Sequence, residues 1–323
     1  MRLGCFTVVY ADRSLEEALD GLAGLRLDMV ELGTGGFIPK SHCNPAELLA
    51  DASKLNALKA LIADRGLEIS ALSCHGNVVH PDKAVSEQHV RDFKETAQLC
   101  GELGVDRIVG FAGCPGDSES AKCPNWVTCS WPDYYADLLK WQWDEKLIPT
   151  WKDLAKHAAK YGVDKISLEM HPGDAVFNPE KLLKLRDAVG PSIGSNFDPS
   201  HLFWQGMDPC LAARELHDCL FHVHAKDSAV EKGVAERFGV LETKSLSAEG
   251  RGWNFKTVGY GHGEDFWKTF IWTLKEIGYD YVISIEHEDH QMSLEEGLKK
   301  AATFLEAMII REKPAELWFD RTD

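Results

Sequence analysis

Short apolar runs alternate with longer amphipathic stretches along the whole chain. Eight of the apolar runs are short and rich in β-branched residues, so we interpret them as strands. They are apolar nearly throughout, which is typical of parallel strands that are covered by helices. The expected strands are Leu3–Tyr10, Met29–Gly33, Glu68–His75, Arg107–Ala112, Lys165–His171, Ile193–Asp198, Leu220–Ala225 and Tyr281–His287.

Helical periodicity dominates the stretches between these strands. Ser14 with Glu17, and Ser293 with Glu296, have the spacing of capping boxes. The expected helices are Ser14–Leu25, Pro45–Arg65, Glu87–Leu103, Pro149–Tyr161, Pro179–Val189, Pro209–His217, Glu264–Ile277 and Ser293–Ile310.

Eight strand–helix units in series predict a single (β/α)8 TIM barrel over residues 1–323. A doubly wound sheet is the alternative, but no Gly-rich dinucleotide turn follows the first strand. The Gly33–Gly36 run follows the second strand and lacks the required spacing. Two segments interrupt the regular spacing, at about 114–148 and 228–262. We expect both to be loop insertions at strand ends, where barrel enzymes build their pockets.

Composition narrows the classes of partner. The chain has 323 residues, 44% hydrophobic and 27% charged, which is ordinary for a globular protein. Its formal net charge of −16 argues against a nucleic-acid partner, which requires a concentrated basic surface. A signal-peptide pattern and a long apolar run are both missing, so we expect no membrane partner. The nine cysteines are scattered without a disulfide pattern, which indicates reduced thiols in a cytoplasm.

Four ionisable residues stand near the ends of the fifth to eighth expected strands, namely Glu169, Asp198, His224 and Glu286. In a barrel these ends converge on one mouth, where carboxylates lose solvation and repel one another. One such acid could be a helix cap, and His224 alone could be a core histidine, but four on successive strands indicate a divalent cation. Oxygen-rich ligands with one imidazole favour Mn²⁺, with Mg²⁺ or Co²⁺ as alternatives and Zn²⁺ less favoured.

Three motifs carry a resemblance that spans essentially the whole chain. They are the run from Asp198 to His201 (DPSH), the run from His224 to Asp227 (HAKD) and the strand that contains Glu286. With them the sequence resembles the sugar phosphate isomerase/epimerase family of the xylose isomerase-like TIM barrels. Relatives in that superfamily include tagatose and psicose 3-epimerases, inosose dehydratase, 3-keto-glycoside eliminases and endonuclease IV.

The resemblance implies a role for each matched residue. Glu169, Asp198, His224 and Glu286 become the metal ligands, and His201 becomes a substrate-contacting histidine. Glu169 and Glu286 also become the catalytic acid and base of an isomerase or epimerase, which acts on a small sugar or keto-sugar through a metal-stabilised enediolate. Family members are commonly homo-oligomers, so we expect one here.

Three further residues are candidates for substrate binding. His75 ends the third strand, His171 shares a strand face with Glu169, and Lys226 lies two residues after His224. Lys226 could equally form a buried ion pair with Asp227 or a neighbour. The Gly259–Gly263 run before a helix is the one weak candidate for a phosphate cradle.

Other functions stay open at this stage. The same chemistry can expel a group by β-elimination, as in a dehydratase or a lyase of 3-keto-glycosides, including C-glycosides. Some such lyases work as the larger subunit of a complex, and the 114–148 insertion could then dock a small partner subunit. An endonuclease IV-like activity is disfavoured, because Phe111–Gly113 offers no histidine and no Asp-x-His lies between His224 and Glu286. An inactive sugar-binding protein would leave both glutamates without a reason.

Overall fold

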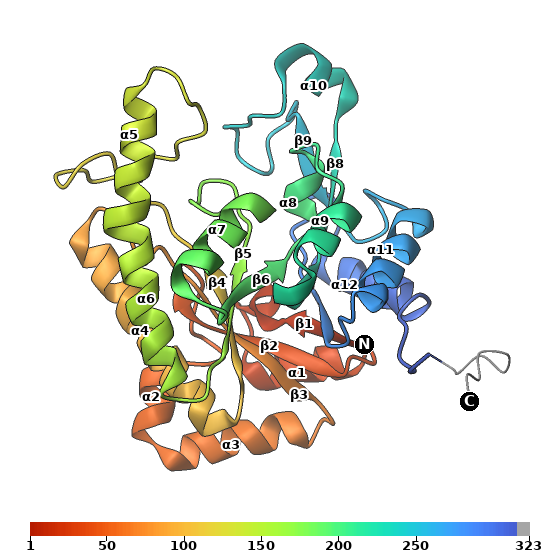
Figure 1. Ribbon diagram of the computed structural model, residues 1–323. Helices are drawn as coiled ribbons and strands as arrows, with labels where there is room; N and C mark the ends of the chain where they lie inside the picture. The colour runs from red at the N-terminus through yellow and green to blue at the C-terminus, as the bar shows by residue number, and fades with distance from the viewer. Residues whose placement is uncertain (315–323) are drawn as a thin grey trace, which may run out of the picture.

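The eight expected strands form a closed parallel barrel in the computed structural model, which describes residues 1–314 (Figure 1). The barrel closes because the first strand pairs with both the second and the last. In order around the barrel the strands are β1 (Arg2–Phe6), β10 (Val282–Ile285), β7 (Leu220–Ala225), β6 (Ile193–Phe197), β5 (Lys165–Glu169), β4 (Arg107–Phe111), β3 (Glu68–His75) and β2 (Met29–Gly36). The prediction of a TIM barrel is therefore confirmed. Only the first expected strand is markedly too long, since Thr7–Tyr10 forms a 3-10 turn.

Helices flank the barrel (Figure 1), and none in residues 1–314 is both long and apolar enough to cross a membrane. The expected helix 45–65 is divided at Asp51, whose backbone is extended. Its side chain caps a second helix by accepting the N–H groups of Ser53 and Lys54. The helices that flank the strands are α1 (Leu15–Ala23), α2 (Pro45–Ala50), α3 (Ala52–Ala63), α4 (Lys83–Leu103), α6 (Ile148–Ala159), α7 (Pro179–Val189), α8 (Ser200–Phe203), α9 (Pro209–Glu215), α11 (Glu264–Glu276) and α12 (Leu294–Glu306).

The insertion at 114–148 is partly helical, contrary to the expected loop. α5 (Tyr134–Trp141) runs through a π-helical turn, Gln142–Leu147, directly into α6. The expected helix 149–161 is present as α6 and its start agrees within one residue, but it continues from α5 through the π turn instead of following a loop. Proline inside an α-helix clashes with the preceding turn, and the wider π turn just before it lets the helix continue through this position.

The insertion at 228–262 contains a small second sheet. β8 (Asp227–Val230) pairs antiparallel with β9 (Trp253–Lys256), and α10 (Lys232–Phe238) lies between them in sequence. A separate apolar cluster holds this sheet on the barrel, with the rings of Trp204 and Trp253 stacked at 5.0 Å and Phe255 beside them. Figure 1 shows both insertions projecting beyond the barrel at the top of the view.

Candidate metal centre

The four predicted metal ligands gather at one end of the barrel. Glu169 ends β5, His224 lies on β7, and Asp198 and Glu286 directly follow β6 and β10. These strands are neighbours in the barrel, so their ends bring one ligand atom from each residue within 4.8 Å of the others. All four side chains are buried or nearly so. The structure brings the set together, while ligation itself stays a prediction.

The chemistry of this donor set fits a divalent cation. Within residues 1–314, Asp198 Oδ2 and Glu286 Oε2 are buried oxygens that accept no hydrogen bond, although Glu286 Oε2 has ion-pair contacts with Lys226 at 3.3 Å and His224 at 3.2 Å. Burial raises the pKa of Asp198 to about 6, as expected for a carboxylate that its protein surroundings stabilise poorly. A cation held by Glu169, Asp198, His224 and Glu286 would give both oxygens a ligand contact in place of the hydrogen bond that they lack.

Glu169 lies among several polar side chains. His201 Nε2 donates a hydrogen bond to Glu169 Oε1 at 3.1 Å, and Asn196 Nδ2 donates to Oε2 at 2.9 Å. His75 Nε2 lies 3.7 Å from the same Oε2. Burial alone would raise the pKa of Glu169, but the hydrogen bonds from His201, His224 and His75 hold it well below its usual range.

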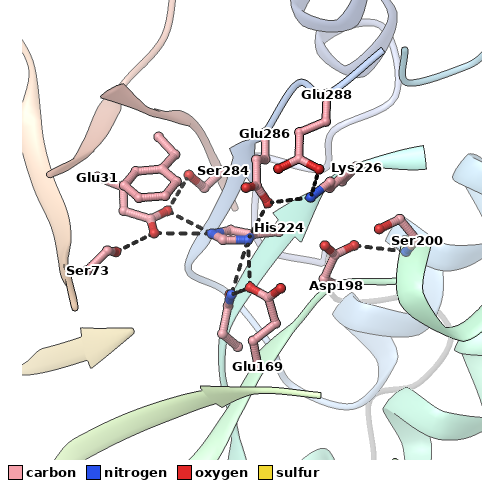
Figure 2. Close-up of polar contacts among 12 residues, drawn as sticks. Glu31, Ser73, Glu169, Asp198, Ser200, His224, Lys226, Ser284, Glu286 and Glu288 are labelled. Carbon is pink, nitrogen blue, oxygen red and sulfur yellow. Dashed lines mark hydrogen bonds and ion pairs between the residues drawn. The ribbon is translucent and has the colours of Figure 1, made fainter. Parts of the chain in front are cut away.

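Lys226 is buried against two glutamates (Figure 2). Its Nζ lies 3.3 Å from Glu286 Oε2 and 3.0 Å from Glu288 Oε2, and 4.3 Å from the ring centre of Phe255. Burial opposes ionisation of Glu286, but Lys226 and His224 outweigh it and lower the pKa of Glu286 below its usual range. Lys226 therefore faces the site and forms the buried ion pair considered as the alternative, with the neighbours Glu286 and Glu288 as its partners. Asp227 instead binds backbone N–H groups.

His171 is the outermost of the predicted substrate-binding residues. Its side chain is 33% exposed, whereas that of His201 is 1% exposed. His171 Nδ1 donates to the Pro172 carbonyl at 2.7 Å if that nitrogen carries the proton, and its ring packs edge-on against His201. All four candidates, His75, His171, His201 and Lys226, thus lie in or beside the cluster around Glu169. Their contacts with a substrate stay predictions.

Glu31 is a buried acid of the site that the sequence pattern did not single out. It lies on β2, across the barrel from the four predicted ligands, and is 0% exposed. His224 Nε2 lies 3.1 and 3.0 Å from its two oxygens, and Ser284 Oγ donates to Oε2 at 2.8 Å (Figure 2). Burial would raise the pKa of Glu31, but His224 and His222 outweigh it and hold the pKa at about 2. An acid inside an apolar strand was the signal available, because such a group needs a buried partner.

Asn196 and His222 were also missed. Each lies two residues before a predicted ligand and therefore shares its strand face. His222 Nδ1 contacts Asn196 Oδ1 at 2.8 Å, while the amide group of Asn196 donates to Glu169. Burial lowers the pKa of His222 to about 3, so its ring is neutral and donates through Nδ1. These two residues connect the barrel interior to Glu169.

The second insertion covers one side of the site. Phe255 on β9 packs edge-on against the ring of His201 at 5.6 Å. Asp227 at the start of β8 accepts the backbone N–H groups of Gly259, Gly261 and His262. These N–H groups of the Gly259–Gly263 run are therefore already hydrogen-bonded to a carboxylate of the chain itself, so the run is not a phosphate cradle in this conformation.

Comparisons with known proteins agree with this architecture. The chain is 38% identical over 312 residues to the uncharacterized protein YfiH of Bacillus subtilis, covering 96% of this chain and 99% of YfiH. Residues 27–308 match the family described as xylose isomerase-like TIM barrel.

Solved structures share the fold at low identity. The IolI protein with a bound zinc atom matches with a TM-score of 0.68 and 19% identity, covering 96% of this chain and 98% of IolI. The probable 3-DHS dehydratase AsbF of Bacillus anthracis matches with a TM-score of 0.67 and 18% identity, over 95% and 99% of the two chains. An L-ribulose 3-epimerase matches with a TM-score of 0.60 and 18% identity, over 95% and 94%. With most of its length inside the family match, the chain belongs to the xylose isomerase-like TIM barrel family.

Proposed function

We propose that this protein is a divalent-metal-dependent isomerase or epimerase of a sugar or keto-sugar. One observation carries the proposal: Glu169, Asp198, His224 and Glu286 present one ligand atom each within 4.8 Å at the ends of four neighbouring strands. Three carboxylates and one imidazole suit a cation that prefers oxygen ligands, so we propose Mn²⁺ ahead of Mg²⁺ or Co²⁺. Zn²⁺ is the competing choice, because the solved IolI structure contains zinc.

The bound cation would act as a Lewis acid on the carbonyl oxygen of the sugar. Glu169 and Glu286 then move the proton of the neighbouring carbon, one as base and the other as acid. His201 holds Glu169 through Oε1, and Lys226 holds Glu286 through Oε2. Both carboxylates are thereby oriented before a substrate arrives, which lowers the entropic cost of proton transfer.

A neutral sugar suits this site better than a phosphorylated one. Lys226 is already paired with Glu286 and Glu288, and the N–H groups at Gly259, Gly261 and His262 are bound to Asp227. A phosphate group would have to displace a carboxylate from one of these partners.

β-Elimination from the same kind of substrate is the second candidate. The 114–148 insertion exposes two large aromatic side chains, Trp131 at 74% and Tyr134 at 61%. Such side chains favour a surface that an aglycone or a small partner subunit could cover. The solved structure of a probable dehydratase with the same fold is consistent with this alternative.

Proton NMR in D₂O tests the reaction. The metal-loaded protein is incubated with ketoses, inososes and 3-keto-glucosides, alongside a chelator-treated sample and the Glu169→Gln variant. Deuterium at the carbon next to the carbonyl, with all substituents retained, supports the isomerase or epimerase. Loss of water or an aglycone supports elimination instead, and no exchange on any sugar contradicts both.

The expected homo-oligomer, with or without a small partner, is tested separately by light scattering of the purified protein.

A further inference from the structure

The two ring nitrogens of His224 face different surroundings. Nδ1 points to the predicted metal site, 3.3 Å from Glu169 Oε2 and 3.2 Å from Glu286 Oε2. Nε2 points the opposite way and lies 3.0 Å from Glu31 Oε2 (Figure 2). A neutral imidazole carries one N–H and one lone pair, so the neighbour of one nitrogen decides what the other can do.

Glu31 is itself firmly held. Ser284 Oγ on β10 donates to its Oε2, and Ser73 Oγ on β3 donates to its Oε1. The pairing of β2 with β3 has a register shift between Val30 and Glu31, which is an irregularity that re-aims a side chain. Glu31 is thus a fixed acceptor with His224 as its third donor.

We infer that Glu31 is a positioning residue for metal binding. Its carboxylate accepts the Nε2–H of His224, so that a cation bound in the site formed with Glu169, Asp198 and Glu286 takes the place of the hydrogen bonds at Nδ1 and meets a lone pair there. This inference rests on the proposed function, because it requires a cation at that site. A carboxylate behind a ligating histidine fixes its tautomer and raises its basicity, and loss of such a partner typically weakens metal binding about 10–100-fold.

Glu31, His222 and His224 could instead hold a second cation, since one ligand atom from each lies within 4.8 Å of the others. The hydroxyl donors from Ser73 and Ser284 favour hydrogen bonding over ligation, because both already occupy lone pairs of the carboxylate. The number of cations bound per chain separates the two cases.

Isothermal titration calorimetry tests the inference. The full-length, chelator-treated protein is titrated with Mn²⁺, and the titration is repeated with Co²⁺. Wild type is expected to bind one equivalent. Glu31→Gln, which keeps the shape of the side chain, is expected to bind at least about tenfold more weakly and to change the visible spectrum of bound Co²⁺. Asp92→Asn is the matched control, because it also removes a buried acid. The hydrogen bonds of Asp92 go to Lys40 and Gln88 and to none of the predicted metal ligands, so this variant should bind the cation with an affinity within about twofold of wild type.

Unchanged affinity in Glu31→Gln would overturn the inference while leaving the proposed function intact. Two equivalents in wild type, with one lost on replacing Glu31 or His222, would overturn it in favour of a second cation site. If Glu31→Gln does not fold, Ser284→Ala decides, because it removes one donor that holds Glu31: weaker binding supports the inference and equal binding contradicts it. A wild type that binds no cation contradicts the proposed function itself.

Discussion

Glu169 and Glu286 have different neighbours, although the resemblance assigns them paired tasks. Glu169 accepts hydrogen bonds from the amide group of Asn196 and the ring of His201, whereas Glu286 faces the ammonium group of Lys226. A nearby cation stabilises a carboxylate in its ionised form. We therefore expect the two glutamates to differ in how far they accept a proton, and replacing them separately should reveal it.

Replacing either glutamate with glutamine should lower kcat by at least about 100-fold, because a positioned acid or base contributes about 10²–10⁴-fold. The measurement is steady-state turnover on the substrate found by NMR, with circular dichroism to verify the fold. Glu288→Gln is the control, since Glu288 also contacts Lys226 but is 40% exposed on its side chain. Turnover near wild type in Glu169→Gln or Glu286→Gln would rule out the proton-transfer scheme.

Single site residues could be predicted where an ionisable side chain stands at a position that the strand pattern buries. Acids and a histidine at successive strand ends conflict with packing, and so Glu169, Asp198, His224 and Glu286 could be singled out. Glu31 contacts His224 across 193 positions of sequence, and no local spacing encodes that contact. Whether Lys226 pairs with Asp227 or with Glu286 was likewise open, because the choice depends on the direction of each side chain after the strand ends.

Among the elements, the loop from Gly259 to Gly263 depends on one carboxylate. Asp227 accepts three backbone N–H groups of this loop and also contacts His262 Nδ1 at 2.8 Å. The loop leads into α11, and the strand that begins at Asp227 carries the sheet beside His201. Asp227 therefore ties the second insertion to the barrel.

Asp227→Asn should destabilise the protein by about 3 kcal/mol, since a buried, multiply bonded carboxylate is lost. The loosening should be local at first, so limited proteolysis should cleave within 228–262 at temperatures where the barrel is still folded. Thermal unfolding and mass spectrometry of the fragments measure both effects. Cleavage spread evenly over the chain would contradict the local role of Asp227.

A second tie joins α4 to β2. Asp92 on α4 is buried, receives the Gly36 N–H at 3.0 Å and pairs with Lys40 at 2.5 Å. Burial would raise the pKa of Asp92, but Lys40, the Gly36 N–H and Gln88 together lower it. A carboxyl whose folded pKa is lowered stabilises the fold above its unfolded pKa of about 3.9, and this stabilisation is lost as the pH falls through the folded value.

Lys40→Met should therefore cost about 2 kcal/mol at pH 7 and progressively less as the pH falls from about 5 towards 3. Melting temperatures of wild type and variant across this range measure the difference. An equal difference at pH 7 and pH 3 would show that Lys40 acts through packing of its side chain instead of its charge.

Elements were predictable to the extent that their signals are local. Strand positions follow from apolar runs, and most of them fall within a few residues of the observed bounds. The start of α6 was predicted within one residue, because a proline normally marks a first turn, but the π turn that joins α6 to α5 has no local signal. The β8–β9 pairing was missed because its strands are separated by α10 and a long loop.

For the whole molecule, the predicted cation should act as part of the folded structure. A ligand that binds only the folded state stabilises it by about 2.7 kcal/mol at a free concentration 100-fold above its Kd. We expect the melting temperature to rise with the concentration of Mn²⁺ and to fall on adding a chelator. An Asp198→Asn variant is the control, since it should lose most of this dependence; a wild type that is insensitive to divalent cations would argue against the site.

The separation of Glu31 from His224 also has a consequence for synthesis. Glu31 lies on the second strand to leave the ribosome, but its histidine partner arrives on a strand made 193 positions later. Until then the carboxylate of Glu31 on the nascent second strand has no histidine partner, and burying this unpaired charge in an apolar interior would be energetically costly. We therefore expect the interior around Glu31 to pack late during synthesis, after the strand that carries His224 has been translated.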